Sequence, residues 1–150
     1  MSASALIDVD LDGIEAGDQL PALVKLPTTE QLVRYAGAAN DYARIHFDAG
    51  HAVERGFDGV IVHGLLKAGF LGQLVTTWCG PGAWVKRFSA QYRRVDRPGR
   101  PVICQAKVTG KRVEGDAVLV DLDLWTEDAE RRVTTKGTAT VVFPTRGANP

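Results

Sequence analysis

The hydrophobic pattern of this chain changes its period near Gly82, and this change limits the folds that the chain can adopt. Residues 62–78 place apolar side chains at helical spacing and include a single charged residue, Lys67. A helix that is apolar on nearly every side is typical of a helix buried inside a domain. We therefore expect a long buried helix here. Its glycines indicate that another backbone packs closely against it: Gly64, Gly69 and Gly72.

Four runs of alternating apolar and polar residues follow this helix. They occupy residues 87–93, 102–108, 118–124 and 133–141. Alternation with a period of two is the pattern of antiparallel strands that bury one face. Glycine, proline and acidic residues between the runs indicate turns at residues 97–100, 114–116 and 127–130.

Shorter elements precede the long helix. The N-terminal arm is irregular, with one extended piece over residues 14–20. Thr28 and Gln31 have the spacing of a capping box and predict a helix over residues 29–38. Residues 47–55 have the composition of a second, short helix.

Together these elements predict a single α+β domain over residues 1–150, with an ordered core over about residues 14–143 and frayed ends. A buried helix needs a partner that covers it. A curved antiparallel sheet wrapped around the helix supplies that cover with the strands available.

Charge and cysteine content exclude several classes of function. The chain has 18 basic and 18 acidic residues, which argues against a domain that coats nucleic acid or an anionic membrane. No signal peptide is apparent, and no stretch approaches the ~20 apolar residues of a membrane span. We therefore expect no nucleic-acid or membrane partner and a cytoplasmic location. Cys79 and Cys104 lack metal-ligand spacing, so we expect free buried thiols.

All three histidines lie within 18 positions, and Asp41 precedes the first of them by five residues. Histidine exchanges protons near neutral pH, and a nearby carboxylate can share that transfer. Asp41 and His46 can therefore hold one water molecule as an acid–base pair. The alternative is that Asp41 caps a turn and His46 is a packing residue. We expect His51 on the exposed side of the short helix, without a chemical role.

His63 and Gly64 stand where the long helix begins. The first N–H groups of a helix have no intrahelical acceptor and carry the positive end of the helix dipole. A glycine there lets a ligand oxygen approach the backbone, which makes an oxyanion hole for a carbonyl that gains negative charge. The alternative is that His63 is a polar helix-start residue and that Gly64 is a packing contact.

Other chemistry finds less support in the sequence. A metal site made of His46, His51 and Asp48 lacks a helical i, i+4 pair of histidines and a thiolate, so we expect no metal. Neither a phosphate-cradling glycine loop nor a Gly-x-Ser-x-Gly nucleophile motif occurs. A basic group after Trp84 is either a solvated sheet face or a dock for a phosphorylated ligand: Lys86, Arg87, Arg93, Arg94, Arg97 and Arg100.

Two motifs resemble those of the MaoC-like (R)-specific enoyl-CoA hydratase and dehydratase family, which has the hot-dog fold. The family signature is close to Gly-Asp-x-Asn-Pro-Ile-His-x-Asp, followed by Gly-Phe and by Ile-Ala-His-Gly-Met. Here residues 40–48 read Asn-Asp-Tyr-Ala-Arg-Ile-His-Phe-Asp, residues 56–57 read Gly-Phe, and residues 61–65 read Ile-Val-His-Gly-Leu. The resemblance covers roughly residues 14–143.

The resemblance implies a hydratase or dehydratase that acts on trans-2-enoyl or 3-hydroxyacyl thioesters of CoA or acyl carrier protein, in fatty acyl or steroid side-chain metabolism. It implies catalytic roles for Asp41 and His46 and a substrate-binding role for Gly64, beside His63. It implies no cofactor, because the CoA or carrier arm is part of the substrate. It also implies a homodimer, or a heterodimer with another hot-dog subunit.

The chain departs from the family signature beside Asp41. The family's first glycine is Asn40 here, and its Asn-Pro pair is Ala43-Arg44. An arginine beside Asp41 can lower the basicity of that carboxylate. Two alternatives therefore stay open: a non-catalytic partner subunit of a heteromeric hydratase, and a hot-dog acyl-CoA thioesterase. The absence of Asp and Glu from residues 62–78 counts against the thioesterase.

Overall fold

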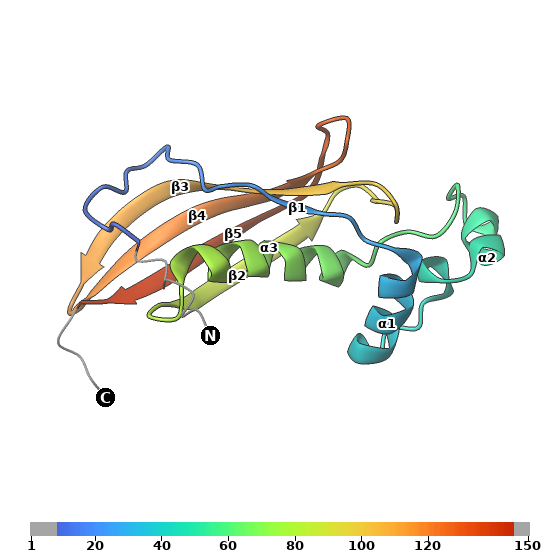
Figure 1. The fold of residues 1–150 in the computed structure, drawn as a ribbon, viewed down its shortest axis with the longest axis horizontal. Coiled ribbons are helices and arrows are strands. Elements are labelled where there is room, and N and C mark those ends of the chain that lie inside the picture. The colour runs from blue at the N-terminus through green and yellow to red at the C-terminus, as the bar shows by residue number, and fades with distance from the viewer. Residues whose placement is uncertain (1–8, 146–150) are drawn as a thin grey trace, which may run out of the picture.

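The computed structural model describes residues 9–145, which form one antiparallel sheet and a long helix beneath it (Figure 1). Helix α3 (Gly64–Cys79) lies along the concave side of the sheet. The prediction of an α+β fold, with a curved sheet around a central helix, is therefore confirmed.

The sheet has five strands in the order β1-β3-β4-β5-β2, and every neighbouring pair is antiparallel. The strands are β1 (Leu23–Lys25), β2 (Trp84–Tyr92), β3 (Val102–Glu114), β4 (Ala117–Glu127) and β5 (Val133–Pro144). All four alternating runs of the sequence form strands, β2 to β5. The extended piece expected over residues 14–20 contributes only an isolated bridge between Gln19 and Lys107, because the chain turns at Gly17, where φ is +106°.

All four strands extend beyond the alternating runs, and in two of them the extension lies past a register shift. β2 starts before a register shift between Val85 and Arg87, and β3 continues past a shift between Val108 and Gly110. An irregularity of this kind breaks the period-two pattern of side chains, although the backbone pairing continues beyond it. Alternation therefore does not predict the parts of β2 and β3 that lie beyond these shifts.

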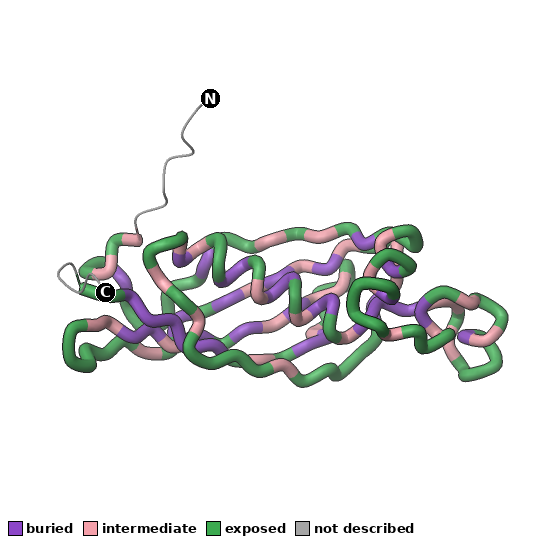
Figure 2. The backbone as a smooth tube through the Cα atoms, turned by 90° about the horizontal axis from the view of Figure 1, so that it is seen from below, coloured by how far each residue is buried: buried purple, intermediate pink, exposed green. Residues whose placement is uncertain are grey.

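Helix α3 buries one face and leaves the other open. Buried residues recur along the helix and the strands (Figure 2). They form one core that includes Leu66, Phe70, Leu71, Leu74 and Val75 on the helix and Val108, Val120, Leu122 and Leu124 on the sheet. On the opposite face Leu65 is 57% exposed, and Gly69 and Gln73 are exposed. The expectation that the helix is buried all round is wrong for a single subunit, because one sheet covers one side of a helix.

Three short helical elements lie beyond the end of the sheet, next to the start of α3 (Figure 1); they are α1 (Thr29–Ala39), the 3₁₀ turn η1 (Arg44–His46) and α2 (Ala49–Glu54). The predicted cap of α1 is present, since Thr28 Oγ1 accepts the N–H of Gln31 at 3.1 Å. Helix α2 is shorter than predicted because Asp48 caps it, accepting the N–H of His51 at 3.0 Å.

We expected frayed ends before about residue 14 and after about residue 143. Most of these residues, 1–8 and 146–150, lie outside the described residues. Thr145, just after β5, is held in place, because its backbone N–H donates to the carbonyl of Asp116 at 2.7 Å. Among residues 9–145 no helix is both long enough and apolar enough to cross a bilayer. Cys79 and Cys104 are free and buried, as predicted, and burial raises the pKa of Cys104 to about 12.

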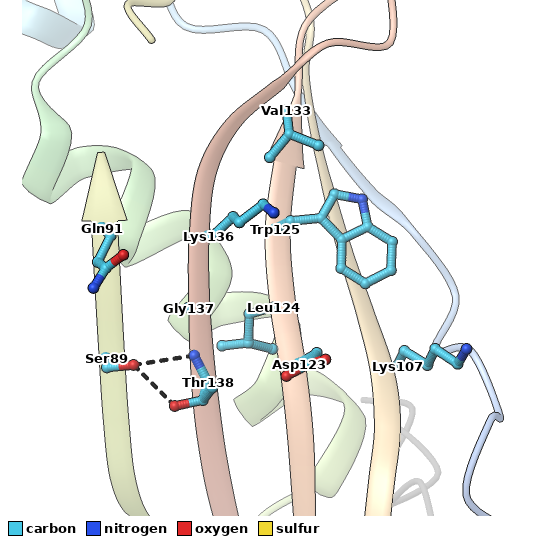
Figure 3. A pocket seen from close by; sticks show the side chains of 10 residues that line it. All are labelled: Ser89, Gln91, Lys107, Asp123, Leu124, Trp125, Val133, Lys136, Gly137 and Thr138. Carbon is cyan, nitrogen blue, oxygen red and sulfur yellow. Dashed lines mark hydrogen bonds between the residues drawn. The ribbon is translucent and has the colours of Figure 1, made fainter. Parts of the chain in front are cut away.

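An open hollow of about 500 Å³ is lined by residues of strands β2 to β5 (Figure 3). At one side of it, Ser89 and Thr138 join β2 to β5 through their hydroxyl groups, 2.9 Å apart. Gly137 lies beside this contact, and a Cβ added there would overlap the backbone oxygen of Ser89. The close approach of β2 and β5 therefore depends on a residue without a side chain.

Gly137→Ala should lower the free energy of unfolding by about 1–3 kcal/mol, since the added methyl group must push two paired strands apart. Urea denaturation of the purified chain measures this loss. Gly110→Ala is the matched control in the same sheet, because nothing lies within 4 Å of a Cβ added at Gly110. Equal losses in the two variants would contradict the packing argument.

Candidate active site

Asp41 follows directly after the end of α1. Asn40 ends that helix in the left-handed conformation, with φ 52° and ψ 35°, and the N–H of Asp41 then donates to the carbonyl of Ala36 at 2.9 Å. One carboxylate oxygen of Asp41 accepts the N–H of Ala43 at 3.3 Å. The helix end and this local turn together set the direction of the carboxylate.

His46 is brought inward by the 3₁₀ turn η1 and is 7% exposed. Its Nδ1 lies 2.8 Å from the backbone oxygen of Ile61. A carbonyl oxygen can only accept, so Nδ1 carries the proton in this contact and Nε2 of the neutral ring is left with a free lone pair. His46 therefore presents a nitrogen base whose orientation is fixed from the other side of the ring.

His63 is the residue that precedes α3, and it is fully buried. Its ring stacks on the ring of His46 with 3.7 Å between centroids and an angle of 19° between the planes. The ring of Tyr35 meets it edge-on at 4.9 Å. Within residues 9–145 neither ring nitrogen of His63 has a hydrogen-bond partner.

Side chains from three separate segments thus converge: Asp41, His46 and His63 each place a ligand atom within 4.8 Å of the others. The sequence-predicted acid–base pair is therefore close in space. Metal binding by this set is disfavoured by geometry, because two nearly parallel stacked imidazoles cannot both aim a lone pair at one ion about 2.0–2.1 Å away.

His51 lies outside this cluster, as expected. It is half-buried rather than exposed, and its Nδ1 is 3.8 Å from a carboxylate oxygen of Glu54 on the same helix. The prediction of an exposed His51 is wrong, because α2 is only six residues long and packs against η1.

Burial lowers the pKa of His63 below its usual 6.5. A charged imidazolium in this place would lose its hydration, and the neighbouring His46 lowers the pKa further, while the carbonyl and carboxylate of Asp41 act in the opposite direction. His63 is consequently neutral at pH 7 and forms a flat, uncharged wall behind the ring of His46.

Gly64 is the first residue of α3, as predicted. A Cβ on Gly64 would lie 2.9 Å from the ring of Tyr92 at the end of β2, so this position has no room for a side chain. The N–H groups of the first helical turn have no intrahelical acceptor. Gly64 therefore fits both interpretations of the sequence: it packs against Tyr92, and it is a backbone donor at the start of the helix.

The structure also accounts for the departures beside Asp41. Asn40 occupies a left-handed conformation, which asparagine tolerates almost as well as glycine. Arg44 forms an ion pair with Asp48 rather than with Asp41, with Nε 3.1 Å from Oδ2. The N–H of His51 and this guanidinium lower the pKa of Asp48. The expectation that Arg44 acts on Asp41 is therefore wrong, because the arginine side chain is drawn to a residue one helical turn further on.

The basic group after Trp84 does not gather into one site. Four of its six members have separate partners: Arg97 with Asp58, Arg100 with Glu130, Lys86 with Glu114 and Arg93 with Gln91. This arrangement favours a solvated surface over a phosphate dock. A different open hollow of about 530 Å³ lies beside η1 and α2, lined by Ala43, Arg44, Ile45, His51, Arg55 and Phe57.

Three residues that contact this region were not assigned a role from the sequence. Tyr35 touches His63, Tyr92 touches Gly64, and Lys67 is buried one turn into α3. The two tyrosines had no signal, because contacts between distant segments leave no local pattern. Lys67 did have one, since it is the only charged residue in an otherwise apolar helix.

His63 should make the chain less stable in mild acid. Because the folded-state pKa lies below 6.5, the unfolded chain binds a proton near pH 6 that the folded chain does not, and the free energy of unfolding falls as the pH drops below about 6.5. Urea midpoints at pH 7.5 and 5.5 measure this fall, and His63→Gln should reduce it. An identical fall in His63→Gln would assign the effect to other groups.

Comparison with known proteins identifies the family. The MaoC like domain matches residues 15–128. The chain is 31% identical to the (R)-specific enoyl-CoA hydratase of Rhodospirillum rubrum over 148 residues, which cover 98% of this chain and 100% of that protein. It is 27% identical over 125 residues to the 3-oxo-4,17-pregnadiene-20-carboxyl-CoA hydratase beta subunit of Mycobacterium tuberculosis, covering 75% of this chain and 97% of that subunit.

Among solved structures, the (R)-hydratase from A. caviae superposes with a TM-score of 0.80 at 22% identity and covers 88% of this chain and 98% of that one. This likeness bears on the fold, while the domain match and the full-length relative bear on the family. The chain belongs to the MaoC-like dehydratase family of enzymes and has the hot-dog fold.

Proposed function

We propose that this enzyme hydrates trans-2-enoyl thioesters of CoA or acyl carrier protein, or runs the reverse dehydration. One observation carries the proposal. The carboxylate of Asp41 and the ring of His46 converge with His63, the residue that precedes the first N–H groups of α3. The addition of water to a conjugated thioester requires an acid–base pair next to an oxyanion site.

In the proposed reaction, Asp41 and His46 hold one water molecule between them. As its oxygen forms a bond to C3 of the enoyl group, the pair accepts one of its protons, and the C2–C3 double-bond electrons move toward the thioester carbonyl. The same proton then passes to C2. The net change is addition of one hydrogen and one hydroxyl group across the double bond.

The carbonyl oxygen of the thioester gains negative charge midway through this reaction. We assign its stabilisation to the N–H of Gly64, at the positive end of the α3 dipole. His63 contributes the buried wall that keeps the His46 ring in place beside this donor. The proton and hydroxyl transfer needs no separate cofactor, since the CoA or carrier arm enters as part of the substrate.

The structure supports catalysis over the two alternatives. α3 carries no Asp or Glu, so it has no helix carboxylate to activate water for thioester hydrolysis. The altered residues Asn40 and Arg44 leave Asp41 and His46 in contact range, so the changed motif does not by itself mark a non-catalytic subunit.

Two classes of acyl group are candidates for the substrate, a fatty acyl chain and a steroid side chain. One relative is an enoyl-CoA hydratase and another is a subunit of a hydratase for a steroid-derived CoA ester. A panel of enoyl-CoA thioesters of both classes, followed by the absorbance of the conjugated thioester, distinguishes them. We also propose a cytoplasmic location, which suits the free thiols Cys79 and Cys104.

We further propose that the subunit works as a dimer joined through β2. This strand is at the edge of the sheet and pairs only with β5, so its outer backbone groups are available to a partner strand. Large apolar side chains on it are exposed: Trp84 at 54%, Phe88 at 40% and Tyr92 at 46%. A second hot-dog subunit, identical or different, would cover them.

Asp41→Asn and His46→Ala should each reduce hydratase turnover by about 10²–10⁴-fold, because each removes one half of the group that moves the proton. The double variant should be little worse than either single variant, since residues that act as a unit are not additive. Thermal melting of the same preparations controls for folding. If the loss of turnover in the double variant equals the product of the two single losses, the two residues do not share one water molecule.

Light scattering should give a mass about twice the 16.2 kDa of the chain, or a multiple of that. Phe88→Lys should shift the mass toward one chain, because it places a charge in the proposed interface. A fully active monomer would refute the dimer. A stable dimer without activity on any enoyl thioester would point instead to a missing catalytic partner, which co-purification from the native cell would reveal.

A further inference from the structure

The buried face of α3 contains one charged side chain, and it is neutralised from outside the helix. Lys67 and Asp96 form an ion pair of 2.8 Å, with 2% and 3% of their side chains exposed. The ammonium group also donates to the backbone oxygen of Arg94 at 2.8 Å. Lys67 thus binds two points of the segment that follows β2.

The same segment also binds the backbone two residues before the helix. The N–H of Val62 donates to the backbone oxygen of Asp96 at 2.8 Å. On its other side the segment is attached to β5, because the N–H groups of Arg93 and Arg94 donate to the carbonyl of Thr134 at 2.9 and 3.1 Å. Residues 93–96 therefore form a strap, bonded to the sheet on one side and to the start of α3 on the other.

The contacts of the strap lie on both sides of Gly64 in the sequence. Val62 stands two residues before it, Lys67 three residues after it, and Tyr92, immediately before the strap, presses its ring against the glycine. The position of the Gly64 N–H relative to Asp41 and His46 is consequently set by bonds on both sides of it.

Stability alone does not explain a charge at this place. Removing an ammonium and a carboxylate from water is unfavourable, and apolar residues of similar volume often replace a buried ion pair without loss of stability. An ion pair differs from an apolar contact in fixing direction and distance. At Lys67 this directional bond acts on the first turn of the helix that supplies the proposed carbonyl donor.

We propose that Lys67 and Asp96 are positioning residues for the reaction: their ion pair holds the first turn of α3 so that the Gly64 N–H meets the thioester oxygen as it gains charge. The inference rests on the proposed hydratase function. The polar contacts of the pair in the described residues are with each other, with the carbonyl of Arg94 and with the N–H of Val62, and not with Asp41 or His46. Its effect is therefore confined to the alignment of the oxyanion donor.

The double variant Lys67→Met/Asp96→Asn tests this, since it removes both charges and leaves no unpaired ion in the core. We expect kcat to fall roughly 10–100-fold, the size of effect that a misplacement of about 1 Å produces, with little change in KM. The pH profile of kcat should keep its shape, because Asp41 and His46 are untouched. Amide hydrogen exchange at Val62 should accelerate, whereas exchange in residues 71–79 should not.

The control is Arg132→Met/Asp128→Asn, which likewise removes a cation and a carboxylate from one ion pair, at the β4–β5 turn, where the arginine side chain is 59% exposed. It should change kcat less than twofold. If Lys67→Met/Asp96→Asn folds poorly, Lys67→Gln/Asp96→Asn serves as the second variant, since it also removes both charges, and it should show a loss of the same kind.

Turnover and Val62 exchange in the folded double variant equal to those of the control would overturn the proposal. Faster exchange throughout α3, with kcat falling only in proportion to lost folded protein, would also overturn it and leave the pair a structural contact. Absence of turnover in the unsubstituted chain would refute the proposed function. In that case unchanged Val62 exchange would still reject the strap, and a selective increase would support it.

Discussion

The packing of the apolar face of α3 against the concave side of the sheet decides where the other groups of this molecule lie. This contact buries the largest aliphatic side chains of helix and strands together and excludes water from both. It also fixes the start of α3 at one end of the sheet. The segment from α1 to α2, which has few contacts with the sheet, takes its place from that helix start through the bond between His46 and the carbonyl of Ile61.

The buried histidines and the buried ion pair of the described residues gather around the first turn of α3, whereas the buried threonines Thr126, Thr134, Thr135 and Thr140 lie on the sheet. His63 has two buried ring nitrogens without a partner in the described chain, and Lys67 is paired with Asp96 close by. An unsatisfied buried polar group costs about 1–3 kcal/mol, and a core selected only for stability would not concentrate such groups. Their concentration beside Asp41 and His46 agrees with a site where alignment of groups matters more than stability.

The altered signature beside Asp41 shows how a motif can change while its geometry survives. Its first position requires a left-handed backbone, and Asn40 adopts one. The usual Asn-Pro pair is replaced by Ala43 and Arg44, and the arginine is held by Asp48 at the start of α2. The turn is therefore stabilised by an ion pair and a helix cap where a proline would act through its restricted φ angle.

The sequence by itself determined the elements whose cause is local. Side-chain period identified α3 and the strands β2 to β5, the hydroxyl of Thr28 marked the start of α1, and the His63-Gly64 pair marked the start of α3. The residues proposed as the acid–base pair, Asp41 and His46, were also recognisable, because their chemistry depends on residue type and their spacing resembled a family signature.

Only the tertiary structure decided what depends on distant segments. The stacking of His63 on His46, the ring of Tyr92 against Gly64 and the pairing of Lys67 with Asp96 join residues 17 to 29 positions apart. No local pattern encodes such contacts, since each partner's side chain is chosen by the space and charge that the folded chain presents. For the same reason the sequence identified Lys67 as an exception in an apolar helix, and the fold alone revealed the carboxylate that it binds.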